Sequence, residues 1–254
     1  MIGNQTIACV IPARLKSTRF PRKMLAYLGG KPLLQRVWER ACSVSSFDKV
    51  VFAVDAEETM QLVQSFGAEC FMTSESCPCG TDRLVELWKS GAVRADIWVN
   101  WQGDEPFIGE QMIVDLLQSC GEKDADLWTL KKRIVNLHEI TSPHFAKVVC
   151  DHQGNALYFS RSQIPYYRDP TPEEDKLFYK HVGLYAFTSE ALRKISELTP
   201  CMIENAEQLE QLRFLYNNLK IRVHETEHEV FGIDLPEHLA KAEAHLASLS
   251  SVLA

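Results

Sequence analysis

The chain has 254 residues, 46% hydrophobic and 24% charged, which is enough apolar material for one large α/β domain or two smaller ones. Its net charge of −7 disfavours a nucleic-acid or membrane-surface partner. No stretch approaches the roughly 18–20 apolar residues that span a bilayer. The apolar run 7–11 is also too short for the core of a secretory leader, so we expect a cytoplasmic protein with free cysteines.

The first half of the chain alternates between short apolar strands and helices. Strands are predicted at 6–11, 49–55, 69–73 and 96–100, and helices at 32–41, 56–66, 81–90 and 109–120. This alternation predicts an α/β fold with a mostly parallel sheet covered by helices on both faces. The loops 12–23, 74–83 and 101–106 all follow strands, and we expect them to converge on one ligand site at the carboxyl edge of the sheet.

The second half has a different pattern. A hairpin is predicted from 145–151 and 156–159, which turns at 153–155, and the Pro- and Tyr-rich segment 163–176 is predicted to be irregular. The remaining predicted elements are a strand at 179–187, a helix at 204–217, a strand at 221–225 and a terminal helix from Pro236.

Positive charge is concentrated at the start of the chain. Residues 1–38 contain seven Lys or Arg and no acidic residue, and the first carboxylate is Glu39. A positive cluster on an acidic protein favours a small polyanionic ligand over a chance imbalance. Guanidinium groups bind phosphate oxygens in pairs, so the loop 12–23 is a candidate phosphate site. It has neither the Walker order nor the Rossmann glycine pattern.

Two aspartates are candidate metal ligands. Asp104 follows a predicted strand, and Asp234 ends an apolar stretch that also reads as a strand. Carboxylates brought together there could hold Mg²⁺ against phosphates. The alternative is that Asp234 caps the helix that begins at Pro236.

The predicted helix 204–217 carries a polar stripe. Glu204, Glu207 and Gln211 recur at helical spacing, so they are expected to share a face. From the spacing alone, such a face is a polar stripe exposed to solvent.

Several short motifs occur together and in order. They are the segments 11–23, 80–84, 99–106, 157–161 with Ile164-Pro165, 181–185, 209–213 and 232–234. With them the chain resembles the 3-deoxy-D-manno-octulosonate (Kdo) cytidylyltransferases, from about Ile7 to Leu239. Arg22 departs from the family pattern, which usually has a small residue there, often glycine.

The resemblance implies a reaction and an assembly. CTP and Kdo would give CMP-Kdo and pyrophosphate with Mg²⁺ as the cofactor, for lipopolysaccharide biosynthesis. The implied fold is that of the nucleotide-diphospho-sugar transferases, as a single domain over 1–254. An inserted β-rich region at about 140–190 would form a homodimer and contribute to the sugar site.

The resemblance also assigns residues. The catalytic set would be Arg14, Lys23 and Asp104, and the metal ligands would be Asp104 and Asp234. The nucleotide would be bound by Ala13, Arg14, Ser17, Arg19, Lys23, Gly80, Arg83 and Gln102, and the sugar by Gln102, Arg161, His181, Tyr185, Glu207 and Gln211. The alternatives are activation of sialic acid, another acidic 2-keto sugar, and a module that binds a sugar nucleotide without catalysis.

Overall fold

The computed structural model describes residues 5–122, 124–172, 175–229 and 231–252. These residues form two compact units. The terminal unit comprises 6–113 with 231–252, and the central unit comprises Gln5 with 114–229. Along the chain, α4 (Glu110–Leu117) and the 3₁₀ turn η2 (Cys120–Glu122) lead from one to the other. Within the described residues, no helix is both long enough and apolar enough to cross a membrane.

The terminal unit contains the four parallel strands that the alternating sequence pattern predicts. They are β1 (Ile7–Ala13), β4 (Lys49–Val54), β5 (Cys70–Met72) and β6 (Ile97–Asn100). Their order is β5-β4-β1-β6, and every pair is parallel. All residues of β1 and β6 are buried, as expected for strands with both faces covered.

Three helices connect these strands: α1 (Leu33–Cys42), α2 (Glu57–Ser65) and α3 (Gly80–Ser90). Connections between parallel strands are right-handed, so crossovers that run in opposite directions along the sheet place their helices on opposite faces. The crossovers through α1 and α2 run from β1 towards β5, whereas the crossover through α3 runs back to β6. The sheet of this unit therefore has helices on both faces, as predicted.

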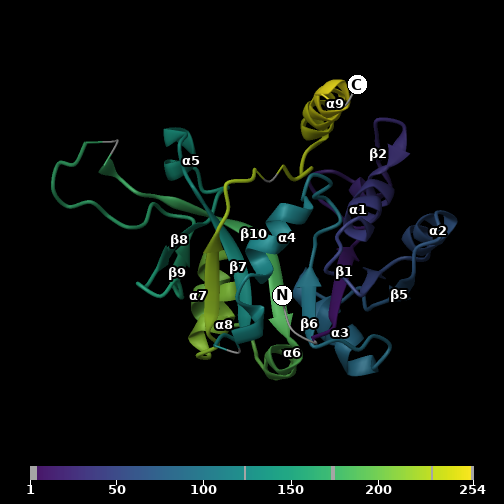
Figure 1. Ribbon diagram of the computed structural model, residues 1–254, viewed down its shortest axis with the longest axis horizontal. Helices are drawn as coiled ribbons and strands as arrows, with labels where there is room; N and C mark the ends of the chain where they lie inside the picture. Colours follow the sequence, from purple (N-terminus) through teal and green to yellow (C-terminus); the bar gives the residue numbers. More distant parts are fainter. Residues whose placement is uncertain (1–4, 123, 173–174, 230, 253–254) are drawn as a thin grey trace. The chain divides into compact units, whose positions relative to one another are not determined.

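A hairpin and the last helix complete the terminal unit. The short strands β2 (Tyr27–Leu28) and β3 (Lys31–Pro32) pair through the turn at Gly29-Gly30, where both glycines have positive φ. The helix α9 (Pro236–Val252) packs beside this hairpin (Figure 1). Leu28, Leu33, Ile233 and Ala242 form the buried centre of that contact.

The central unit is built on antiparallel pairs. The strand β10 (Tyr179–Thr188) pairs antiparallel with β7 (Leu127–Arg133) and with β8 (Lys147–Cys150). The strands β8 and β9 (Ala156–Ser160) form the predicted hairpin, and β11 (Ile221–Glu225) lies parallel to β7. The described part of 163–176 contains no regular strand or α-helix, as expected. The sequence analysis missed β7, α5 (Leu137–Thr141) and α6 (Ser189–Ile195).

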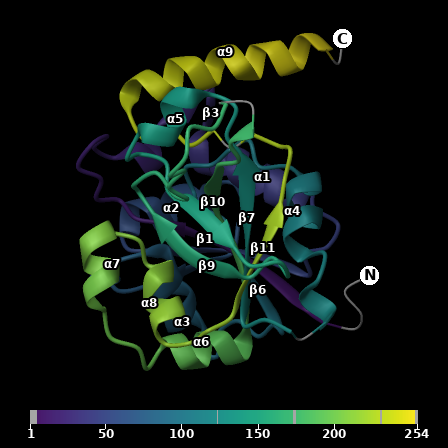
Figure 2. The ribbon, with the colours of Figure 1, turned by 90° about the vertical axis from the view of Figure 1, so that its left-hand side faces the viewer.

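One predicted helix is wrong. The stretch 204–217 forms two short helices, α7 (Met202–Glu207) and α8 (Gln211–Tyr216), because Gln208 between them has a left-handed backbone with φ of 52°. Glu204, Glu207 and Gln211 therefore do not share one helical face. The helix α8 packs against β9, and α7 packs against α8 (Figures 1 and 2).

Candidate functional site

The basic loop leaves the carboxyl end of β1, where Ala13 is buried. Arg14 and Arg19 are exposed, and Ser17 accepts a hydrogen bond from the backbone N–H of Phe20. The loop is tied to the next strand because the Asp55 carboxylate accepts from the backbone N–H of Leu15 at 2.8 Å. The loop thus presents cations to solvent from a fixed base.

Lys23 bridges the two predicted metal ligands. Its Nζ lies 2.5 Å from Asp104 Oδ2 and 3.1 Å from Asp234 Oδ1, and the residue is only 5% exposed. Arg19 Nη2 donates to the same Asp234 oxygen at 3.0 Å. Residues more than 200 positions apart in sequence thus meet in one cluster, and each cation reduces the repulsion between the carboxylates.

The hydrogen bonds of Asp234 help to decide whether it caps the helix that begins at Pro236 or belongs to the site. The backbone N–H of the preceding residue, Ile233, donates to the Asp104 carbonyl at 2.9 Å, and this bond brings the two acidic segments together. The carboxylate of Asp234 points to Lys23 and Arg19. The hydrogen bonds therefore favour the interpretation of Asp234 as part of the cationic cluster.

Glu105 is an acidic neighbour that the sequence analysis did not single out. Its Oε2 is buried and has no hydrogen-bond partner. Burial, followed by the charges of Asp104 and Asp234, raises the pKa of Glu105 to about 8. An unpartnered oxygen beside two carboxylates is a place where a cation would be stabilised.

The donor set can be compared with what Mg²⁺ requires. Mg²⁺ commonly takes one or two carboxylates and completes its shell with water and substrate phosphates. Among the described residues, no group of three or more His, Cys, Asp or Glu comes together in a way that could hold a metal ion by itself. Asp104 and Asp234 therefore fit an ion that also takes phosphate oxygens as ligands.

The other predicted nucleotide residues lie at the start of α3. A Cβ on Gly80 would lie 2.7 Å from Gln102 Nε2 and 3.1 Å from Pro12 Cγ, so a larger residue here would displace the Gln102 amide. Gln102 in turn donates to Asn100 Oδ1 at 3.0 Å. Gly80 and Gln102 are thus brought together beside the base of the loop.

Arg83 is buried, and its hydrogen bonds hold together the loops at the carboxyl edge of the parallel strands. Its guanidinium donates to Asp55 Oδ2 at 2.8 Å, to Thr73 Oγ1 at 2.7 Å and to the carbonyl of Ser74 at 3.1 Å. Asp55 therefore connects α3 with the basic loop through its two oxygens. In the sequence, the feature that could have indicated this role of Asp55 is its position at the end of a predicted strand.

In the central unit, hydrogen bonds join the segment around Arg161 to the segment around Glu207. Glu207 accepts from Ser160 Oγ at 2.6 Å and from the backbone N–H of Arg161 at 2.9 Å. The Arg161 guanidinium donates to the carbonyls of Glu207 at 2.7 Å, Pro143 at 2.8 Å and Gln208 at 3.2 Å. A guanidinium has five N–H donors, and these bonds use three of them.

His181, Tyr185 and Gln211 complete the predicted sugar set. His181 lies against Tyr185, with ring centroids 5.3 Å apart, and burial lowers its pKa to about 3. Its Nε2 lies 2.9 Å from Thr129 Oγ1, a hydroxyl that also donates to the carbonyls of Val182 and Leu184. The hydroxyl has one proton, and when it donates that proton to a carbonyl, Nε2 carries the ring proton and Nδ1 is the acceptor.

Gln211 is 3% exposed, and its Nε2 is buried without a hydrogen-bond partner. A buried amide donor without a partner costs free energy unless a ligand or water satisfies it. This supports a binding role for Gln211, and its signal in the sequence was the motif 209–213.

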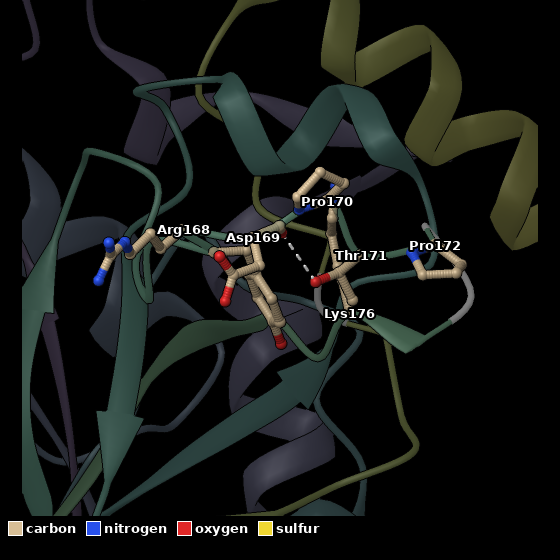
Figure 3. Close-up of a pocket in the computed structure, with 7 residues that line it drawn as sticks. Arg168, Asp169, Pro170, Thr171, Pro172 and Lys176 are labelled. Carbon is tan, nitrogen blue, oxygen red and sulfur yellow. Dashed lines mark hydrogen bonds between the residues drawn. The ribbon is translucent and has the colours of Figure 1, made fainter.

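A separate pocket of about 560 Å³ lies in the irregular segment and contains none of the predicted site residues. Figure 3 shows its lining, with Thr171 donating to the carbonyl of Asp169 at 3.0 Å and Arg168 directed away from the other labelled side chains. The predicted nucleotide and metal residues belong to the terminal unit. The predicted sugar residues belong to the central unit, except for Gln102.

Comparison with known proteins agrees with the motifs. The sequence profile of the cytidylyltransferase family matches residues 8–221. The 3-deoxy-manno-octulosonate cytidylyltransferase of Pelobacter propionicus is 44% identical, with 96% of this chain and 99% of that protein aligned. The one from Geobacter sulfurreducens is also 44% identical, with 92% and 97% aligned.

A solved structure is similar as well. CMP:2-keto-3-deoxy-manno-octonic acid synthetase complexed with CTP has a TM-score of 0.89 and 40% identity, over 96% of this chain and 99% of that chain. The likeness extends over both units, and the predicted fold class is confirmed. The chain therefore belongs to the cytidylyltransferase family, among the 3-deoxy-manno-octulosonate cytidylyltransferases.

Proposed function

We propose that this protein transfers CMP from CTP to the anomeric hydroxyl of Kdo and releases pyrophosphate, in the cytoplasm, for lipopolysaccharide biosynthesis. The observation that carries the proposal is the Lys23 bridge between Asp104 and Asp234, in a chain 44% identical to enzymes of that name over nearly its whole length. The sugar hydroxyl oxygen forms a bond to the α-phosphorus, the bond from that phosphorus to the oxygen of the β-phosphate breaks to release pyrophosphate, and the hydroxyl proton passes to solvent.

The basic loop would bind the triphosphate. Arg14 and Arg19 are exposed at the carboxyl end of β1, where a ligand can reach their guanidinium groups. Lys23 is held at the bottom of the loop by two carboxylates, so its charge is already placed before the nucleotide arrives. Such prearranged charge stabilises the transition state, in which negative charge moves onto the leaving pyrophosphate.

Magnesium is part of the same proposal. Asp104 and Asp234 would hold the ion, which supplies charge neutralisation on the phosphates and lowers the pKa of the attacking hydroxyl. At this end of the proposed nucleotide site, a side-chain carbon on Gly80 would displace the Gln102 amide. Backbone groups of Ala13, Gly80 and Arg83 would then contact the base directly.

The sugar would be bound by the central unit. The two remaining Arg161 donors suit a carboxylate, because a rigid guanidinium binds both of its oxygens. The Gln211 amide is a buried donor without a partner, and His181 Nδ1 would accept from a sugar hydroxyl when Nε2 carries the ring proton. Tyr185, beside His181, and Glu207 complete the proposed set in this unit, whereas Gln102, which the resemblance also assigns to the sugar, belongs to the terminal unit.

A pyrophosphate-release assay tests the reaction. The purified protein would be incubated with each of the four nucleoside triphosphates and with Kdo or sialic acid. We expect release only with CTP and Kdo, and its loss after removal of divalent cations with EDTA and its return with Mg²⁺. Activity with sialic acid but not with Kdo would refute the substrate, and full activity in EDTA would refute the metal assignment.

We also propose a homodimer formed through about 140–190. Exposed apolar side chains in this region support it, namely Leu157, Tyr166 and Leu177, because such groups on a surface often mark an interface. Light scattering coupled to size-exclusion chromatography should give twice the mass of the chain. A mass of 28.9 kDa at micromolar concentration would contradict the dimer.

A further inference from the structure

Lys147 is a fully buried cation with no role in the assignments above. It lies on β8, and the residue has 0% exposure. Its Nζ donates to the carbonyls of Arg161 at 2.6 Å, Phe145 at 2.7 Å and Ser142 at 2.9 Å. An ammonium group has three donors, so these bonds use all of them. The three acceptors are neutral, so they leave the positive charge of Lys147 in place.

The carbonyls that Lys147 binds belong to the segments that Arg161 also holds. Arg161 Nη1 donates to the carbonyl of Pro143, in the middle of the 142–145 loop that Lys147 contacts at both ends. Lys147 also fixes the main chain of Arg161 itself. Together the two cations join the loop 142–145, the end of β9 and the break between α7 and α8 at 207–208.

The charges around this junction do not cancel. Burial lowers the pKa of Lys147 and the nearby Arg161 lowers it further, whereas Glu207 raises it, which means that both neighbours are electrostatically coupled to the ammonium. Within the junction, Lys147 and Arg161 face the single carboxylate of Glu207, whereas the neighbouring Lys180 is itself paired with Glu139 and Glu229. The charge of Lys147 is buried, so solvent and salt screen it little at short distances. It therefore favours an anion bound beside Arg161.

We propose that Lys147 is a positioning residue for the acidic sugar, which fixes Arg161 through main-chain carbonyls and adds positive charge behind it. The proposal rests on the proposed function, because it takes the sugar carboxylate as the ligand of the two remaining Arg161 donors. It predicts that Lys147 contributes to binding of the sugar and has little effect on binding of the nucleotide.

The test is a kinetic comparison of Lys147→Met with the matched control Lys132→Met. Lys132 is a strand lysine whose ammonium donates to the main-chain carbonyl of Glu227 and pairs with Glu229, and neither partner is a group that Arg161 binds. The Michaelis constants for Kdo and CTP and kcat would be measured separately. We expect Lys147→Met to raise the KM for Kdo by at least about tenfold, with the KM for CTP and kcat at saturating Kdo within about threefold. Lys132→Met should leave all three within about twofold.

A second variant allows for loss of folding. Lys147→Gln removes the charge but keeps two amide donors for the carbonyls, and it should raise the KM for Kdo in the same direction. An unchanged KM for Kdo in either folded variant, or an equal rise in the KM for CTP, would overturn the proposal. If both variants fail to fold while Lys132→Met folds, Lys147 is purely structural and the proposal is also wrong. Absence of wild-type turnover with Kdo would instead refute the proposed function.

Discussion

The substitution Asp55→Asn separates the stability of the basic loop from its chemistry. The Asp55 carboxylate accepts from Leu15 N–H on one oxygen and from Arg83 Nη2 on the other, each at 2.8 Å. Asparagine has one oxygen and one NH₂ group, so one of these donors would face another donor. Arg83 is 2% exposed, and its charge would lose its only carboxylate partner among the ion pairs of the described residues.

The expected cost follows from burial. Removal of one partner from a buried ion pair costs about 3–5 kcal/mol, because the remaining charge is left uncompensated. Two bonds from Arg83 to Thr73 and Ser74 remain, so we expect the lower end of that range, about 3 kcal/mol. With a urea dependence of about 2 kcal/mol per molar, the unfolding midpoint should fall by about 1.5 M.

The assay combines urea unfolding with kinetics. We expect the KM for CTP to rise by about tenfold, because the loop that carries the phosphate-binding cations loses its anchor at Leu15. The matched control is Asp48→Asn, since Asp48 also accepts from a β1 backbone N–H, that of Ile7 at 2.7 Å, but at the opposite end of the strand. It should lower stability by about 1 kcal/mol and leave the KM for CTP unchanged. A loss below about 1 kcal/mol for Asp55→Asn, or an unchanged KM for CTP, would refute this reasoning.

Three further predictions concern single groups. Lys23→Met should lower kcat by about 100-fold in the pyrophosphate-release assay. The control Lys16→Met should change kcat less than about twofold, since Lys16 pairs with the exposed Glu75. Equal losses in kcat would contradict the catalytic role of Lys23. Gly80→Ala should lower kcat/KM for CTP by about tenfold because its Cβ would overlap Gln102, with Gly121→Ala, which meets open space, as the control. For His181, whose pKa falls from 6.5 to about 3 in the folded state, the unfolded state binds more protons. Stability should therefore decrease as pH falls from 6.5 towards 3, by up to about 1.4 kcal/mol per pH unit, and His181→Gln should reduce that slope in urea titrations.

The terminal unit could be predicted well from the sequence because its signals are local. Each strand of its sheet is a short apolar run, and each helix has a stop or start residue beside it, such as Gly91 after α3 or Pro32 before α1. The parallel order then follows from the right-handed connections. The strand β7 was missed because its second half, Lys131 to Arg133, is a run of basic residues.

The break between α7 and α8 could not be predicted in this way. Nothing in the local pattern marks Gln208, which adopts a conformation that favours glycine. Its carbonyl and that of Glu207 both accept from Arg161, a residue more than 40 positions earlier, and Leu209 after it is buried. Tertiary bonds thus stabilise a backbone that the isolated segment would not prefer.

Arg22 has a left-handed backbone at the position where the family pattern usually has a small residue. Arg22 has φ of 58°, a region that glycine enters at little cost, which accounts for the small residue usual there. In this chain the strain is accompanied by an ion pair between Arg22 and Glu58 on α2. Both side chains are about half exposed, so this pair offsets only part of a cost of about 1 kcal/mol.

Ion pairs in the fold reduce the number of cations that the basic loop can offer to a ligand. Counted along the sequence, the loop is a run of cations without acids, but acids from distant segments neutralise several of them in the fold. Glu75 pairs with Lys16 and Glu58 pairs with Arg22, so these two cations contribute little to a bound phosphate. Lys23 differs because it is buried between two carboxylates that also suit a metal ion. A triphosphate bound with Mg²⁺ would supply a cation for the two carboxylates and an anion for the ammonium of Lys23. The specific feature of the site is therefore the balanced cluster around Lys23, since a net positive loop alone would bind any small polyanion.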